Sequence, residues 1–221
     1  MELYHLTNRG IDGRKIFIDN TDRARFVHDL YEFNDIAPAT QFNRASKNVG
    51  RLTSNMGPRE RLVDIHGWKL MTNHFHLLIS ERVEDGLSAF IRKLTGYGRY
   101  FNERHERRGP LFQGGKKILI KDEGHFLYIL HYVHLNALDD LSDFKNWRER
   151  DKGGIPNPCK ALEHLEKDRW SSYRDYCGIA NFPSILTKTL FEDRSGGYEA
   201  NLKEFLKDRL FENFDQTLLE Y

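Results

Sequence analysis

The stretch NHFHLLIS, residues 73–80, places two histidines one residue apart in an otherwise apolar run. Side chains of a β-strand alternate between the two faces of a sheet, so His74 and His76 share one face while Phe75 lies on the other. A single buried histidine is most often a hydrogen-bonded core residue, and an H-x-H pair alone only suggests a metal site. The meaning of the pair therefore depends on which other side chains reach its face.

Length and composition indicate a folded, water-soluble protein. The chain has 221 residues, of which 39% are hydrophobic, 13% aromatic and 30% charged, and this suits one large domain or a domain with appendages. No run approaches the roughly 20 apolar residues that span a bilayer, and the N-terminus lacks the basic start and apolar run of a signal peptide. The two cysteines, Cys159 and Cys177, lack metal-knuckle spacing. We therefore expect a cytoplasmic protein with no membrane partner.

Positive charge is concentrated in one part of the chain. Residues 92–121 contain nine Lys or Arg and two Glu, a local charge of +7, so the other residues carry −6 within the net +1. A solvated helix face normally carries more interleaved acids, whereas a basic stripe is the footprint of a polyanion site. We expect phosphate contacts from Arg99, Arg104, Arg107, Arg108, Lys116 and Lys117.

The hydrophobic periodicity predicts an α+β fold, a central antiparallel sheet with helices packed on it. Strands are predicted at residues 3–7, 62–70, 74–80 and 116–121, the middle two forming a hairpin around 71–73. Helices are predicted from Asn20 or Thr21 to about Tyr31, at 85–105 and at 122–138, with shorter ones at 160–167, 170–177 and 198–211. Loops are predicted at 10–13, 34–60 and 109–115, and near 153–158.

The predicted helix at 122–138 presents two neighbouring faces. Its packing stripe consists of Phe126, Ile129, Leu130, Val133 and Ala137. Tyr128, Tyr132 and Asn136 gather on the next face. A tyrosine and an asparagine four residues apart lie ~5–6 Å from each other, one turn above the other. Both side chains are therefore close enough to address a single ion-bound phosphate.

These groups suggest a metal-assisted reaction at phosphate. Two histidines and an asparagine oxygen leave open positions on a divalent cation, which water and a substrate oxygen can fill. A cation there would polarise a phosphodiester as a Lewis acid. A phenol with an unperturbed pKa of ~10 is a poor nucleophile at neutral pH, so it needs positive charge nearby. The metal and the basic segment are the candidate sources of that charge.

Several ordered motifs resemble a known family, the REP-associated tyrosine transposases, which are single-tyrosine members of the His-hydrophobic-His (HUH) endonuclease superfamily. The motifs are YHLTNRG at 4–10, WKLMTNHFHLLI at 68–79, YFNERHERRGPLFQG at 100–114, YVHLN at 132–136 and RWSSY at 169–173. They cover most of residues 1–177 in the expected order. Ala137 departs from the family pattern, since a proline commonly follows the asparagine.

The resemblance implies a ferredoxin/RRM-like HUH catalytic domain over residues 1–138, with 34–60 as a loop insertion. Residues 139–221 would form a mainly helical C-terminal extension packed on it. His74, His76 and Asn136 would bind Mg²⁺ or Mn²⁺, and Tyr132 would attack single-stranded DNA at a hairpin-forming repeat. The products would be a 5′-phosphotyrosine link and a free 3′-OH. The resemblance also implies a nucleoid-associated protein that acts as a monomer or a homodimer.

Some assignments within this interpretation stay open. Tyr128 is the alternative nucleophile, although it matches no tyrosine of the family and suits packing or substrate contact better. His131 and His134 point away from the reactive face, as structural or DNA-contacting residues. Among the aromatic residues of the basic segment, Tyr97 and Phe101 suit the core, while Phe112 suits base stacking.

Two other functions fit the sequence less well. One is a catalytically inactive nucleic-acid-binding module on the same fold. The other is a zinc hydrolase that uses His74 and His76, but it lacks an acidic third ligand with motif spacing.

Overall fold

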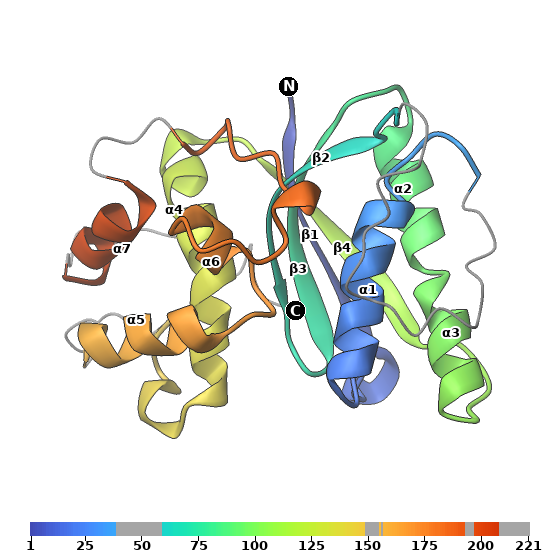
Figure 1. The fold of residues 1–221 in the computed structure, drawn as a ribbon, viewed down its shortest axis with the longest axis horizontal. Helices are drawn as coiled ribbons and strands as arrows, with labels where there is room; N and C mark the ends of the chain where they lie inside the picture. Colours follow the sequence, from blue (N-terminus) through green and yellow to red (C-terminus); the bar gives the residue numbers. More distant parts are fainter. Residues whose placement is uncertain (39–58, 149–154, 156, 193–196, 208–221) are drawn as a thin grey trace.

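Four antiparallel strands form the centre of the computed structural model, which describes residues 1–38, 59–148, 155, 157–192 and 197–207 (Figure 1). The strands lie in the order β2-β3-β1-β4. Their bounds are Leu3–Gly10 for β1, Val63–Leu70 for β2, His74–Glu81 for β3 and Phe112–Ile120 for β4. The predicted α+β fold with an antiparallel sheet, including the hairpin of β2 and β3, is confirmed.

The helices complete a β-α-β-β-α-β arrangement of the ferredoxin-like kind. Helix α1 (Asn20–Glu32) connects β1 to β2, while α2 (Gly86–Leu94) and α3 (Tyr97–Arg104) connect β3 to β4. Helix α4 (Glu123–Leu135) follows β4. The C-terminal part adds α5 (Pro158–Lys167), α6 (Tyr173–Tyr176) and α7 (Tyr198–Lys207). Short 3₁₀ turns lie at Ile11–Gly13, Asn136–Asp140, Ser142–Phe144 and Pro183–Ile185.

Helices cover both faces of the sheet, so the described residues form three layers (Figure 1). Helices α1, α2 and α3 pack on the face that carries Phe75, Leu77 and Ile79. Helix α4 packs on the face that carries Leu78, and α5, α6 and α7 share its apolar cluster. Gly67 permits the close approach of α4, because a Cβ there would lie 2.7 Å from Cδ1 of Leu130. Among the residues described, no helix is long and apolar enough to cross a membrane.

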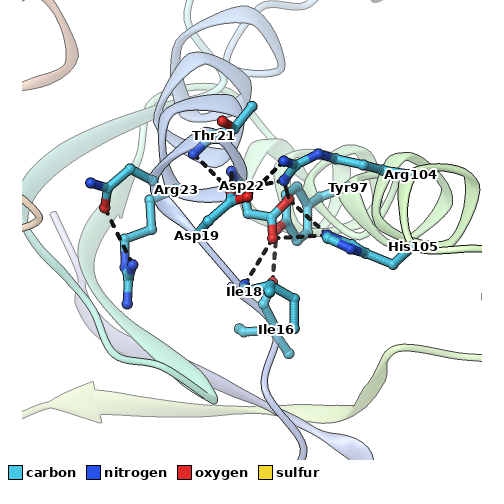
Figure 2. A network of polar contacts seen from close by, with 10 residues as sticks. Ile16, Ile18, Asp19, Thr21, Asp22, Arg23, Tyr97, Arg104 and His105 are labelled. Atoms are coloured by element: carbon cyan, nitrogen blue, oxygen red, sulfur yellow. Dashed lines mark hydrogen bonds and ion pairs between the residues drawn. The ribbon is translucent and has the colours of Figure 1, made fainter.

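Helix α1 begins at Asn20, but its N-cap lies one residue before the two residues, Asn20 and Thr21, that the sequence offers as caps. Asp19 is its N-cap, and its side chain accepts hydrogen bonds from the backbone N–H groups of Thr21 and Asp22. The cap is tied to α3, since Arg104 donates to both Asp19 and Asp22 (Figure 2). This hydrogen bonding from Arg104 holds the pKa of the Asp19 carboxyl well below its usual range.

The prediction of one helix over 85–105 is wrong, because two helices fill that range. The backbone N–H groups of Gly96 and Gly98 bond three residues back, to the carbonyl oxygens of Lys93 and Thr95. Such bonds tighten the chain into a 3₁₀ turn and interrupt the α-helical pattern. Glycine at both positions weakens the helix locally.

Strand β4 begins four residues earlier than predicted, so the predicted loop at 109–115 is partly strand. Its first half contains Gly114 and Gly115, and such a glycine-rich stretch reads as loop in a sequence. The pairing with β1 shifts between Asn8 and Gly10, which marks a bulge. Gly114 has a φ of +121°, a conformation that favours glycine.

The remaining helix boundaries differ by a few residues. The predicted helix at 122–138 ends at Leu135 and passes into a 3₁₀ turn at Asn136–Asp140. The helix predicted at 170–177 occupies only Tyr173–Tyr176. The helix predicted at 198–211 is present to Lys207, and 208–211 lie outside the described residues. The same holds for 39–58 in the loop predicted at 34–60, and for 153, 154 and 156 in the segment predicted near 153–158.

Candidate active site

The histidine pair of β3 faces α4, and a third histidine from β1 joins it. Thr7 pairs with His76 in the antiparallel ladder, so alternation places His5 and Arg9 of β1 on the face of His74 and His76. Nε2 of His5 lies 2.9 Å from Nδ1 of His76, and the two rings stack with centroids 5.2 Å apart. The ring centroid of His74 lies 4.9 Å from that of His76. Sequence reasoning missed His5.

All three imidazoles are neutral at pH 7. Burial lowers the pKa of His5 to about 3, that of His74 to about 4, and that of His76 well below its ordinary value. Neutral imidazole is the form that binds metals. Nδ1 of His74 lies 2.7 Å from Oδ1 of Asn73 and donates to it, which leaves the lone pair of His74 on Nε2.

Two nitrogens of this group, Nδ1 of His5 and Nε2 of His76, have no hydrogen-bond partner. Nε2 of His76 is buried and unpaired. Because buried polar atoms are nearly always paired, such an atom calls for a ligand. If Nδ1 of His76 donates to His5, the lone pair of His76 lies on Nε2 and is available to a cation.

Tyr132 of α4 lies against the imidazoles. The centroid of its ring is 5.9 Å from those of His5 and His76, edge-on to each. Helix α4 is fixed at its start by Asp122, whose carboxylate accepts from the backbone N–H of His125. The structure thus brings together the tyrosine and the histidines that the sequence analysis singled out. Tyr132 is only 3% exposed, so the site is closed to a large substrate in this conformation.

Asn136 lies one turn beyond Tyr132, in the 3₁₀ turn, and both ends of its amide are engaged. Its Nδ2 donates to the carbonyl oxygen of Tyr132 at 2.7 Å, and its Oδ1 accepts from Arg148 at 2.7 Å. Arg148 also donates to both carboxylate oxygens of Asp139, at 2.6 and 2.8 Å, and lies over the Trp147 ring. The sequence analysis missed Asp139 and Arg148.

Arg148 links the amide to the tyrosine. Its guanidinium carbon lies 5.8 Å from the centroid of the Tyr132 ring. Burial would lower the pKa of Arg148, but Asp139 and, to a lesser extent, Tyr132 hold it above the ordinary value. A fixed positive charge therefore lies beside the phenol.

Further cations share this face of the sheet. Lys69 pairs with His76 in the ladder and makes a nearly buried ion pair with Asp168 at 2.7 Å. Lys116 of β4 pairs with Thr7, and its charge helps to lower the pKa of His5. Arg9 is a major cause, after burial, of the lowered pKa of His74. Such an environment favours an anion at the site.

The other residues of α4 are structural. Tyr128 is buried and packs on Tyr132 and Phe205, with ring centroids 5.9 and 5.2 Å away. Both His131 and His134 lie within hydrogen-bond distance of the Tyr198 hydroxyl, and His134 also reaches the Ser172 hydroxyl at 2.7 Å. These contacts join α4 to the C-terminal part of the chain.

The residues present fit a divalent cation in part. His74 and His76 offer neutral nitrogens, one of them buried without a partner. Asn136 offers its oxygen only after Arg148 releases it. Within the described part of the chain, no group of three or more His, Cys, Asp and Glu side chains is arranged to hold a metal. The donor set is therefore the two histidines and one amide, without a carboxylate.

The predicted DNA-binding residues lie on both sides of the sheet. Arg99, Arg107 and Phe112 line an open groove on the side of α2 and α3, away from Tyr132. Lys116 and Lys117 are neighbours on β4 and so face opposite sides. Arg108 is exposed. Tyr97 and Phe101, expected in the core, are buried there.

Arg104, another predicted DNA-binding residue, makes ion pairs inside the protein. It donates to Asp19 and Asp22, beside His105, in the network of Figure 2. The hydrogen bond with Asp19 holds the pKa of Arg104 above its ordinary value. Its visible role is to join α3 to the start of α1.

Comparisons with known proteins add little to this description. No protein-family model matches the chain, and no curated protein matches it. One solved structure, described as "Structure of the REP associates tyrosine transposase bound to a REP hairpin", covers 89% of this chain and 91% of that chain at 10% sequence identity, with a TM-score of 0.47. A likeness this low does not assign the chain to a family.

Proposed function

We propose that the chain is a divalent-metal-dependent transposase, an endonuclease and strand transferase that acts on single-stranded DNA at hairpin-forming repeats. One observation supports this most: the unpaired Nε2 of His76 lies in a buried cluster with Tyr132 against it. The ordered sequence motifs described above give independent support. The proposal names Tyr132 as the nucleophile and His74, His76 and Asn136 as the metal ligands, for Mg²⁺ or Mn²⁺.

In the proposed reaction, the Tyr132 phenol loses its proton and its oxygen attacks a phosphodiester phosphorus. The new O–P bond forms as the P–O3′ bond breaks, and the departing 3′ oxygen takes up a proton. The products are a 5′-phosphotyrosine and a free 3′-OH. Because the covalent link conserves the phosphodiester, the 3′-OH of another strand can reverse the step without ATP.

The surrounding residues would have distinct roles. Arg148 places positive charge beside the phenol, which favours its ionised form. With the tautomer that leaves the lone pair of His76 on Nε2, His5 would accept from Nδ1 of His76 and so orient that ring, as a positioning residue. A cation bound by the two histidines and Asn136 would supply Lewis-acid stabilisation of the phosphate. For DNA to enter, Trp147 and Arg148 must move from Tyr132, and the same motion frees the Asn136 oxygen.

The test is a covalent adduct between protein and DNA. Purified protein is incubated with single-stranded oligonucleotides that cover the flanks of its own gene, with Mg²⁺ or Mn²⁺, and run on a denaturing gel. We expect an adduct that chelation abolishes and that Tyr132→Phe reduces by at least about 10³-fold, because the attacking atom is gone. Tyr128→Phe, a matched change one turn away, should retain it. An adduct of wild-type yield from Tyr132→Phe would refute the nucleophile assignment.

The closed site favours a second candidate function. Tyr132 is covered and the Asn136 oxygen is occupied by Arg148, as in a non-catalytic module that binds nucleic acid on this fold. That function predicts salt-sensitive binding of single-stranded DNA, no adduct with any metal, and the same affinity with and without chelator.

A further inference from the structure

A groove on the opposite face of the sheet is lined by a residue whose buried amide oxygen has no hydrogen-bond partner. The groove lies between α3 and β4 and is open, with a volume of about 620 Å³. It falls within the range of small-molecule sites, which is ~300–1,000 Å³. Its lining includes Asn8 of β1, Arg99 and Asn102 of α3, and Arg107 and Phe112 near the start of β4.

Asn8 forms part of the groove wall and is 4% exposed. Its Oδ1 is buried and has no hydrogen-bond partner. Its Nδ2 lies 3.7 Å from where a Cβ of residue 115 would be, so the absence of a side chain at Gly115 leaves room for the amide. A buried amide oxygen normally accepts a hydrogen bond, and the residue that carries this one lines the groove.

Phe112 provides an aromatic ring in the same groove. The ring is half-buried and is held from behind by Phe75 and Tyr97, with centroids 6.1 and 6.4 Å away. The bulge between Asn8 and Gly10 re-aims the strand at this point. The three residues that follow Phe112 on β4 are a glutamine and two glycines, so no large side chain follows the ring along the strand.

The charge of the groove favours a ligand with phosphates. The guanidinium of Arg107 donates to Oδ1 of Asn102 and to the carbonyl oxygens of Gly109 and Pro110, all neutral acceptors. Arg99 pairs with Glu103 at 3.0 Å, but both side chains are exposed, and an exposed ion pair is readily exchanged for another. Positive charge beside an aromatic ring is the usual combination for single-stranded nucleic acid.

We propose that this groove binds an unpaired nucleobase of the DNA strand. Phe112 stacks on the base, Oδ1 of Asn8 accepts an N–H from its edge, and Arg99 and Arg107 contact the flanking phosphates. Every base carries at least one such N–H, so Asn8 would favour a nucleotide with a base over an abasic one. The inference rests on the proposed function for the identity of the substrate as DNA, but not on Tyr132 or on a metal.

The test compares two labelled strands of equal length, a deoxyadenosine homopolymer and an abasic deoxyribose-phosphate strand, by fluorescence anisotropy with chelator present. Asn8→Leu keeps the side chain's size and removes the acceptor. We expect it to weaken binding of the homopolymer about tenfold and to leave the abasic strand unaffected. Its unfolding temperature should not fall, because no internal hydrogen bond is lost. Phe112→Ala should likewise weaken binding of the homopolymer and not of the abasic strand, whereas Phe112→Trp should bind the homopolymer as the wild type does. Ile179→Ala, a change far from the groove, is the control.

The outcomes separate this inference from the proposed reaction. Equal losses for both strands, or no loss for Asn8→Leu and Phe112→Ala, would overturn the base site. So would a wild-type protein that binds the two strands equally. Absence of a covalent adduct, with the preference for the homopolymer intact, would refute the proposed reaction and leave the base site standing.

Discussion

The two faces of the sheet differ in almost every physical respect. The face toward α4 is closed: His5, His76 and Tyr132 are buried, and cations there are paired or enclosed. The face toward α3 has an open groove with exposed arginine and an amide oxygen without a partner. The closed face has the groups for bond-making, and the open face has the groups for binding. Under the two proposals, one sheet keeps bond-making and base binding on separate sets of side chains.

Strand β4 connects the two faces. It lies at the edge of the sheet, and alternation directs Lys116 toward the histidines and Lys117 toward the opposite side, over the Tyr4 ring. A DNA strand that passes over this edge would meet positive charge on both sides. The separation of tasks predicts that each face can be disabled without the other.

The largest expected effect comes from His76. His76→Ala removes a proposed metal ligand, and loss of several kcal/mol of charge stabilisation should lower the adduct rate on the order of 10³-fold. Homopolymer binding should stay within experimental error, since the groove lies across the sheet. Adduct kinetics and anisotropy on the same variant measure both. Equal loss of rate and binding would show that the histidines are structural.

A smaller effect is expected from His5, which contacts His76 and is proposed to act through that ring. His5→Leu should weaken Mn²⁺ binding by about 10–100-fold, the usual range for residues that orient a ligand. His5→Gln can still accept from Nδ1 of His76 and should recover most of that affinity. Titration calorimetry with Mn²⁺ reports this without any reaction. Similar Mn²⁺ affinities of His5→Leu and His5→Gln would exclude the positioning role.

The closed face should also make stability depend on pH. Burial lowers the pKa of His5 to about 3 and that of His74 to about 4, from 6.5. Below pH 6.5 the unfolded chain binds more protons than the native one, so the free energy of unfolding falls as the pH drops toward 4. We expect the unfolding temperature to fall by several degrees between pH 7 and 5, measured by circular dichroism. His74→Gln should flatten the dependence of the unfolding temperature on pH. An unchanged slope would show that His74 is not held in its neutral form by the fold.

The smallest effects are expected from the two lysines of β4. Each lysine that contacts a phosphate contributes about one counterion to the salt dependence of binding. Lys116→Ala and Lys117→Ala should each reduce the slope of log affinity against log salt by about 1, and the double variant by about 2. Anisotropy titrations over a range of salt measure this. A change from only one lysine would show that DNA stays on one face.

Local patterns predicted the sheet, the hairpin and the tyrosine helix, because alternation and helical spacing lie within single segments. The same patterns could not predict which side chains meet across neighbouring strands, because this depends on the register of strand pairing. His5 joins His76 only because β1 pairs with β3 in one register, and Lys69 meets Asp168 far along the chain. Arg148 reaches Asn136 from an irregular segment without a period to read.

The basic segment shows the same limit. A count of charge in residues 92–121 cannot separate Arg104, which holds α1 to α3, from Arg107, which lines the groove. The bulge at Asn8 likewise has no local signature beyond glycines that suggest a loop. Register and bulges arise from pairing between distant segments, and they decide which residues form each face.

Mass spectrometry of the protease-digested adduct would show directly whether the phenolic oxygen of Tyr132 is the atom that attacks the phosphate. Residues 122–145 lie between two lysines and contain both Tyr128 and Tyr132, so fragment ions separate the two assignments. We expect the nucleotide mass on Tyr132 alone. The same mass on Tyr128, or on a residue outside α4, would contradict it.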